Sequence, residues 1–140
     1  MTDEQIKLVK KTWRLIRLVD PQLVGDLFYS KLFADKPSLR NMFPKKMDEQ
    51  YRKLIDMLNA IVARLDRLDE LNTEIVEMAR RHSGYGVRPA HYKMVGTALL
   101  WTLQKGLGSD WTTEVKNSWV ECYTILADIM MGASAVKPGE

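Results

Sequence analysis

Cysteine and histidine are scarce in this chain of 140 residues, which holds one cysteine and two histidines. The lone Cys122 excludes an internal disulfide framework, a cysteine-rich zinc site and covalent cofactor attachment through a Cys-x-x-Cys-His motif. No apolar run approaches the roughly 20 residues that a membrane-spanning helix needs. The first residues are polar and acidic, without a basic stretch leading into an apolar segment. We therefore expect no secretory signal, no membrane partner and a cytoplasmic location.

Excess charge is also lacking, because 21 basic and 18 acidic residues leave a net charge of +3. Five basic residues nevertheless fall near one face of the first predicted helix: Lys7, Lys10, Lys11, Arg14 and Arg17. A nucleic-acid footprint is one interpretation of this face. The other is a solvated face opposite the apolar Ile6, Val9, Trp13 and Ile16. We favour the second interpretation and expect no nucleic-acid partner.

Strand signals are missing as well. The sequence has no sustained period-two alternation and no Asn-Gly or Asp-Gly hairpin, and apolar residues recur at helical spacing almost throughout. A hydrophobic content of 46% with 28% charged residues is typical of one globular domain. We predict an all-α domain over residues 1–132, followed by a frayed tail over residues 133–140.

Helix-start signals divide this domain into seven or eight helices of unequal length. Thr2 and Gln5 form a capping-box pattern, and Pro21, Pro37 and Pro89 suit first turns. The seven helices that we can delimit run over about residues 2–18, 21–33, 37–43, 48–65, 73–82, 89–106 and 112–131. Such unequal lengths do not suit a simple four-helix bundle.

His82 is the most informative residue of the chain. It ends an apolar stripe formed by Leu71, Ile75, Met78 and Ala79, so the imidazole emerges on the buried face of its helix. A neutral imidazole there can anchor a transition metal, with the Met78 carbonyl one turn earlier as acceptor for its second nitrogen. The alternative is a hydrogen-bonded core histidine without a ligand. His91, in the first turn of the next helix, has no apolar stripe and is expected at the surface or in a polar network.

The order and spacing of several segments resemble a known family. They are Leu27 to Tyr29, Phe33 with Pro37 and Phe43, Gln50 with Leu54, Arg80 to Val87, His91 with Tyr92, and Val95 with Gly96. Together they resemble single-domain bacterial globins of the three-over-three fold, similar to the haem domain of flavohaemoglobins. The resemblance covers residues 2 to about 132. It implies a globin fold around a pocket for haem b, iron protoporphyrin IX.

The resemblance makes His82 the proximal ligand of the haem iron and places the Tyr92 phenol nearby. In some relatives a carboxylate late in the last helix completes a polar network there. The corresponding position in this chain is Ser134, so the resemblance does not predict a strongly charge-assisted histidine. A half-buried core tyrosine with a satisfied hydroxyl is the alternative for Tyr92.

On the opposite, distal side the resemblance places Tyr29, Gln50 and Leu54. Bound dioxygen acquires partial negative charge, and the Tyr29 hydroxyl and the Gln50 amide are both hydrogen-bond donors. Phe43 resembles the phenylalanine that packs flat on the macrocycle, although a helix-terminal core residue would look the same. A core role for Tyr29 is likewise the alternative to its distal role.

Four more residues are expected around the haem. Lys53 and Arg81 are candidate partners of the propionates, with ordinary exposed basic residues as the alternative. Val87 is expected at the haem edge, and Val95 together with Leu54 leaves room for the group.

The expected function is reversible binding of dioxygen and of other diatomic gases such as nitric oxide and carbon monoxide. One alternative is nitric oxide dioxygenase, which would detoxify nitric oxide. Because the chain ends after the last globin helix, that activity would need an external reductase. Another alternative is a haem-free globin-like sensor or interaction module. A monomer or a homodimer is expected.

Overall fold

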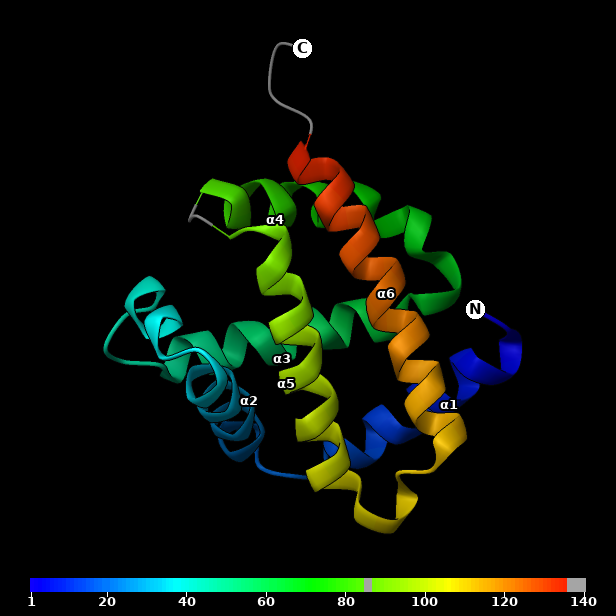
Figure 1. Cartoon of the computed structure of the whole chain (residues 1–140). Helices are drawn as coiled ribbons and strands as arrows, with labels where there is room; N and C mark the ends of the chain where they lie inside the picture. The colour runs from blue at the N-terminus through cyan, green and yellow to red at the C-terminus, as the bar shows by residue number, and fades with distance from the viewer. Residues whose placement is uncertain (85–86, 136–140) are drawn as a thin grey trace.

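Helices account for nearly all of the part of the chain that the computed structural model describes, residues 1–84 and 87–135 (Figure 1). The α-helices are α1 (Asp3–Ile16), α2 (Pro21–Asp35), α3 (Asp48–Ala63), α4 (Asn72–Gly84), α5 (Pro89–Leu107) and α6 (Thr113–Ala135). Three short 3-10 segments join them: η1 (Pro37–Met42), η2 (Leu65–Leu71) and η3 (Gly108–Asp110). No strand occurs in residues 1–84 or 87–135. The predicted all-α class is therefore confirmed.

Local capping chemistry explains where the first helices begin. The Gln5 backbone N–H donates to the Thr2 hydroxyl at 3.1 Å, and the Thr2 backbone N–H donates to the Gln5 side chain at 2.9 Å. This is the predicted capping box, which satisfies two otherwise unpaired backbone donors. Asp20 caps α2 by accepting from the Gln22 N–H at 2.9 Å, and Pro21 occupies the first turn.

Two boundaries differ from the prediction. The expected break over residues 67–72 holds the 3-10 segment η2, which is interrupted where Arg67 takes non-helical angles (φ −142°, ψ 47°). The last helix runs to Ala135 instead of residue 131. Most of the predicted tail, residues 136–140, lies outside the described residues.

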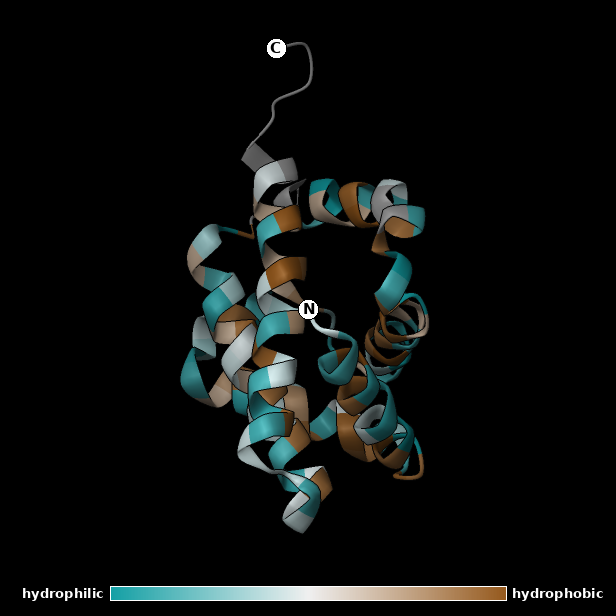
Figure 2. Ribbon diagram, turned by 90° about the vertical axis from the view of Figure 1, so that its right-hand side faces the viewer, coloured by the Kyte–Doolittle hydropathy of each residue, from teal (hydrophilic) through white to brown (hydrophobic). Residues whose placement is uncertain are grey.

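Each α-helix packs closely on one or more of the others. α2 packs on α3 and α5, α1 packs on α6, and α4 packs on α6 and η2. α3 and α4 share few close contacts, and in Figure 1 α4 lies above α3. α6 packs on both α4 and α5. Hydrophobic and hydrophilic residues alternate along the helices, as expected for amphipathic segments (Figure 2). No helix in the described ranges is both long enough and apolar enough to cross a bilayer.

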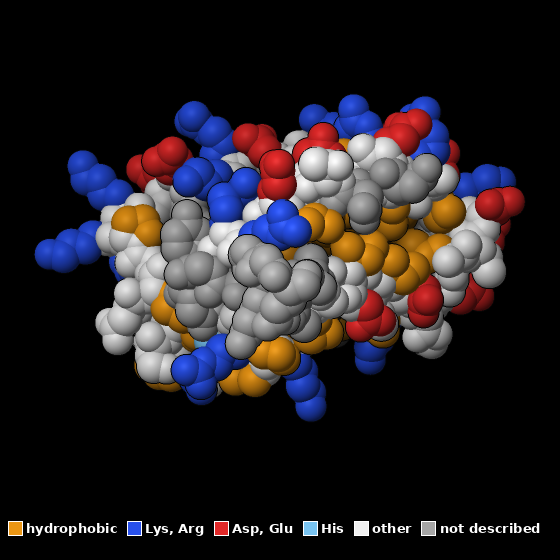
Figure 3. Space-filling model, turned by 90° about the horizontal axis from the view of Figure 1, so that it is seen from above, with side chains coloured by type: hydrophobic (Ala, Val, Ile, Leu, Met, Phe, Trp, Pro, Cys, Tyr) orange, Lys and Arg blue, Asp and Glu red, His pale blue; other side chains and the backbone are white. Residues whose placement is uncertain are grey.

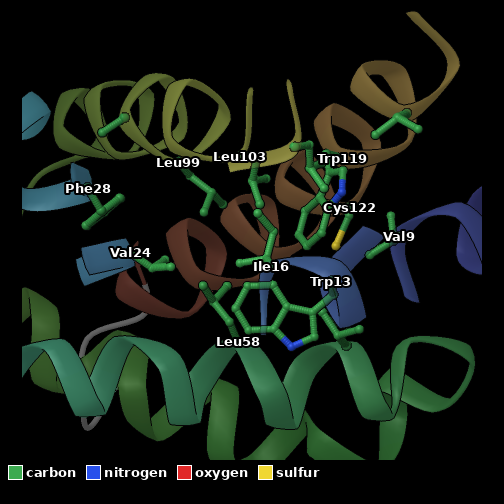
Figure 4. Close-up of a cluster of buried hydrophobic side chains, with 14 of the residues drawn as sticks. Val9, Trp13, Ile16, Val24, Phe28, Leu58, Leu99, Leu103, Trp119 and Cys122 are labelled. Carbon is green, nitrogen blue, oxygen red and sulfur yellow. The ribbon is translucent and has the colours of Figure 1, made fainter. Parts of the chain in front are cut away.

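The buried side chains form two hydrophobic clusters, which we call the first core and the second core. The first core joins α1, α2, α3, α5 and α6, and Figure 4 shows Trp13, Ile16 and Trp119 at its centre. Both indoles are satisfied: Trp13 Nε1–H donates to Asn59 Oδ1 at 2.8 Å, and Trp119 Nε1–H donates to the Thr12 hydroxyl at 2.9 Å.

The second core is smaller and attaches α4 to the end of α6. Ile75 and Ala79 of α4 pack there with the α6 residues Leu126, Ala127 and Met130. Ile61 of α3, Leu71 of η2 and Tyr92 of α5 complete it. The face of α4 that carries the predicted apolar stripe is therefore buried against α6.

Candidate functional site

The proximal half of the candidate site is His82, half-buried near the end of α4. Its Nδ1 lies 2.7 Å from the Met78 carbonyl oxygen, the acceptor predicted from the sequence. Because a carbonyl only accepts, Nδ1 must carry the hydrogen, and the neutral ring then keeps an unprotonated Nε2. The Val87 N–H donates to the His82 carbonyl at 3.0 Å.

A pocket of about 160 Å³ lies between α3 and α4. Its lining is mainly apolar and includes Met57 and Ile61 of α3 with Ile75 and Met78 of α4. The exposed charged residues Glu74 and Arg81 also border it. At the end of the molecule where α4 lies, hydrophobic side chains reach the surface between charged groups (Figure 3). Since water-exposed apolar surface in a concavity is typical of a ligand site, this pocket suits an apolar group.

The distal half of the candidate site centres on Tyr29 of α2, whose side chain is 5% exposed. Four aromatic rings surround it, with centroids at 4.9 Å (Phe28), 5.4 Å (Phe43), 5.7 Å (Tyr51) and 5.9 Å (Phe33). Burial raises the pKa of the Tyr29 phenol, a hydrogen bond with Gln50 opposes the shift, and the nearby Tyr51 adds to it. The phenol is therefore protonated at neutral pH and able to donate a hydrogen bond.

Phe43 is held in place by Arg40, a contact that the sequence did not reveal. The Arg40 guanidinium donates to the carbonyls of Phe43 at 3.3 Å, Pro44 at 2.8 Å and Lys45 at 3.0 Å. It also lies 5.6 Å from the ring centroid of Phe33. One side chain thus fixes the turn that carries Phe43, because a guanidinium offers several donors in a rigid plane.

The other predicted residues divide between the two cores. Leu54 and Val95 are half-buried against the first core, and Met78 and Val87 against the second. Lys53 and Arg81, the predicted propionate partners, are exposed, and the Lys53 ammonium lies 4.0 Å from Glu49. His91 accepts from the Arg88 N–H through Nδ1 at 3.0 Å, as expected for a residue in a polar network at a helix start.

Tyr92 carries an orphaned polar atom. The side chain is buried in the second core, and its hydroxyl has no hydrogen-bond partner among the described residues. The described residues therefore supply no partner for the satisfied hydroxyl of the alternative interpretation. The Tyr92 carbonyl, by contrast, accepts from the Tyr123 hydroxyl at 2.5 Å. The side chain of Ser134, which takes the place of the carboxylate of some relatives, lies outside the described residues.

Tyr51 is the main distal residue that sequence reasoning missed. It follows Gln50 on α3 and stacks on Tyr29 with an interplanar angle of 21°. A Cβ atom at Gly25 would lie 2.6 Å from the Tyr51 ring, so glycine is needed for this close approach of α3 to α2. A glycine in the middle of α2 was the only local signal, and it did not identify its partner.

A family model for globins matches residues 26–130. This chain belongs to the globin family. Among its relatives, a flavohemoprotein of Vibrio cholerae is 28% identical over 134 residues, which cover 94% of this chain but 34% of that protein. An uncharacterized globin-like protein of Aquifex aeolicus is 30% identical over 131 residues, covering 94% of this chain and 92% of that protein. This globin therefore spans about a third of the length of the flavohemoproteins it matches.

Solved structures agree with the fold. An engineered carbene transferase, made from a candidate nitric oxide dioxygenase of Rhodothermus marinus, superposes with a TM-score of 0.85 at 24% identity. The alignment covers 96% of this globin and 94% of that chain. The predicted globin fold is thus confirmed.

The residues present fit the haem that membership of this family implies. The Met78 carbonyl leaves Nε2 of His82 available as a metal ligand. The mainly apolar pocket between α3 and α4 includes Met78, one turn before His82, but His82 itself does not line it. In the first core, the protonated Tyr29 phenol provides a buried donor.

Proposed function

We propose that this globin binds haem b through Nε2 of His82 and reversibly binds dioxygen and other diatomic gases, including nitric oxide and carbon monoxide. The observation that carries the proposal is the hydrogen bond from His82 Nδ1 to the Met78 carbonyl at 2.7 Å. It selects the neutral tautomer that ligates iron and fixes the orientation of the ring. A core histidine without a ligand would leave Nε2 unused.

Ferrous haem supplies the gas-binding chemistry when it is bound, and the side chains of this globin tune it. Tyr29 and Gln50 donate hydrogen bonds to a ligand that carries partial negative charge, and burial of Tyr29 keeps competing water away. Phe43, Leu54 and Val95 supply apolar walls on the first core. Val87 and Tyr92 extend the wall on the second core.

Arg81 is the propionate partner that we propose first, because it is exposed beside the pocket between α3 and α4. Lys53 is the second candidate. Its surface contact with Glu49 at 4.0 Å is weak enough to exchange for a propionate.

A second candidate function is oxidation of nitric oxide to nitrate with dioxygen. The Tyr29–Gln50 pair favours it, since two donors slow ligand loss and leave time for a second gas to react. The structural neighbour made from a candidate nitric oxide dioxygenase also supports this second candidate function. An external reductase would supply the electrons, and steady nitrate formation with such a donor would distinguish this activity from storage.

Absorption spectra of purified variants test the proposal. His82→Ala should abolish stable haem retention or give a spectrum that added imidazole restores, whereas His91→Ala should leave the oxidised, reduced and carbon monoxide spectra close to wild type. His91 is the matched control because its Nδ1 already accepts from the Arg88 N–H. Equal damage from both substitutions, or a wild-type protein that takes up no haem, would overturn the proposal.

A further inference from the structure

A second pocket, of about 170 Å³, lies where α1, the turn after it, α2 and α3 meet. Its lining shares no residue with the pocket between α3 and α4, so the proposed haem site does not account for it. Most of the lining is apolar and consists of Trp13, Ile16, Val19, Pro21, Val24 and Ile55. Trp13, Ile16 and Val24 are buried in the first core (Figure 4), so the inner wall of this pocket is apolar.

The two remaining lining residues, Arg17 and Asn59, are polar. Arg17 is exposed just after α1, and its guanidinium has no ion pair or hydrogen bond among the described residues. The nearby Asp20 accepts from the Gln22 N–H instead. Asn59 of α3 accepts from the Trp13 indole N–H through its side-chain oxygen at 2.8 Å, which leaves the NH₂ group of its amide as a donor. The pocket therefore combines an apolar wall with one positive charge and a second donor.

We propose that this pocket binds a small aromatic carboxylate, with its ring against Trp13 and its carboxylate on Arg17 and Asn59. A carboxylate only accepts hydrogen bonds, and its two oxygens match the parallel N–H groups of a guanidinium. An apolar cavity of about 150 Å³ holds benzene, so a pocket of about 170 Å³ has room for one six-membered ring. Inorganic phosphate would leave the apolar wall uncovered, and a hydrocarbon would leave the guanidinium without a partner.

Benzoate is the probe for this site. The purified protein is reduced and saturated with carbon monoxide, which keeps the carboxylate off any haem iron, and ligand-observed nuclear magnetic resonance gives the dissociation constant. Wild type should bind benzoate with a dissociation constant of roughly 1 mM or below, as a ligand of this size allows. Arg17→Met keeps an apolar stem but removes the charged donor, so it should weaken binding by about tenfold.

Arg14→Met is the matched control. Arg14 is also exposed and lies three residues earlier on α1, but it does not line the pocket. The variant loses the same charge as Arg17→Met and should keep the affinity of wild type for benzoate. Benzamide, which has the same shape without the charge, should bind wild type about tenfold more weakly than benzoate. Arg17→Met should remove this preference, because the guanidinium is what distinguishes the two molecules.

The indole N–H signals of the ¹⁵N-labelled protein give the location of the bound ring. The Trp13 signal, identified by its loss in Trp13→Phe, should move as benzoate is added. The signal of Trp101 on α5, which does not line the pocket, should move much less. Wild type that shows no saturable binding of benzoate, equal losses in Arg17→Met and Arg14→Met, or a Trp13 signal that does not move would each overturn the inference. Because no lining residue belongs to the proposed haem site, a failure here leaves the proposed function intact.

Discussion

Replacing Tyr29 by phenylalanine isolates the hydroxyl from the ring. The ring keeps its contacts with Phe28, Phe43 and Tyr51, so no cavity opens in the first core. Only a donor is lost from a site that is 5% exposed, where water cannot easily replace it. A hydrogen bond of about 1.4 kcal/mol to the bound ligand corresponds to a roughly tenfold faster dissociation of dioxygen. Gln50→Leu removes the second donor and should have an effect of the same size.

Stopped-flow spectroscopy measures both dissociation rates on the reduced protein. Carbon monoxide is the internal control, because it carries little negative charge when bound and its dissociation should change much less. Gln50 hydrogen-bonds the Tyr29 phenol, so the two effects need not add, and the double variant completes a thermodynamic cycle. If dioxygen and carbon monoxide dissociation rise by the same factor, the residues act through packing, and the hydrogen-bond mechanism is wrong.

Three further predictions concern stability, each measured by chemical denaturation. Gly25→Ala should lower the free energy of unfolding by about 1–3 kcal/mol, because the new Cβ would lie 2.6 Å from the Tyr51 ring. In a protein that already carries Tyr51→Ala, the same substitution should cost much less. An equal loss with Tyr51 and with Ala at position 51 would contradict the contact. Tyr92→Phe should raise the free energy of unfolding of the haem-free protein by about 1 kcal/mol, since it removes a buried hydroxyl without a described partner. A fall of about 1 kcal/mol in the free energy of unfolding would show that the hydroxyl has a hydrogen-bond partner. Burial raises the pKa of the Cys122 thiol from 9.0 to about 12, so the unfolded chain loses this proton first. Between pH 9.0 and about 12, the free energy of unfolding of wild type should therefore fall as the pH rises, by about 1.4 kcal/mol per pH unit relative to Cys122→Ala. Parallel pH profiles of the two proteins would refute the raised pKa.

The features predicted correctly from the sequence are local ones. The Thr2–Gln5 capping box and the His82–Met78 hydrogen bond join residues three or four apart, a spacing fixed by helix geometry. Pro21 marks a helix start because its ring angle suits the first turn. These rules depend on neighbours in the chain, so they hold before the tertiary structure is known.

The contacts that the sequence did not reveal are those between elements. Stacking of Tyr51 on Tyr29 depends on how closely α3 approaches α2, and the Arg40 contacts depend on how the chain turns after η1. The burial of the Tyr92 hydroxyl away from any partner among the described residues depends on the packing of α4 and α6 around it. The end of α6 was placed too early because Gly132 reads as a stop signal, although the helix continues through it.

The division into two cores gives α4 a degree of independence. Ile75 and Ala79 of this helix are buried in the second core, whereas the five other α-helices contribute the side chains of the first core. α4 packs mainly on α6 and η2. A ligand bound at His82, as we propose, would add to these contacts and stabilise the helix. A ligand that binds only the folded helix stabilises it by a free energy that grows with the logarithm of the ligand concentration above the dissociation constant, so ligand supply and the local folding of α4 would be linked.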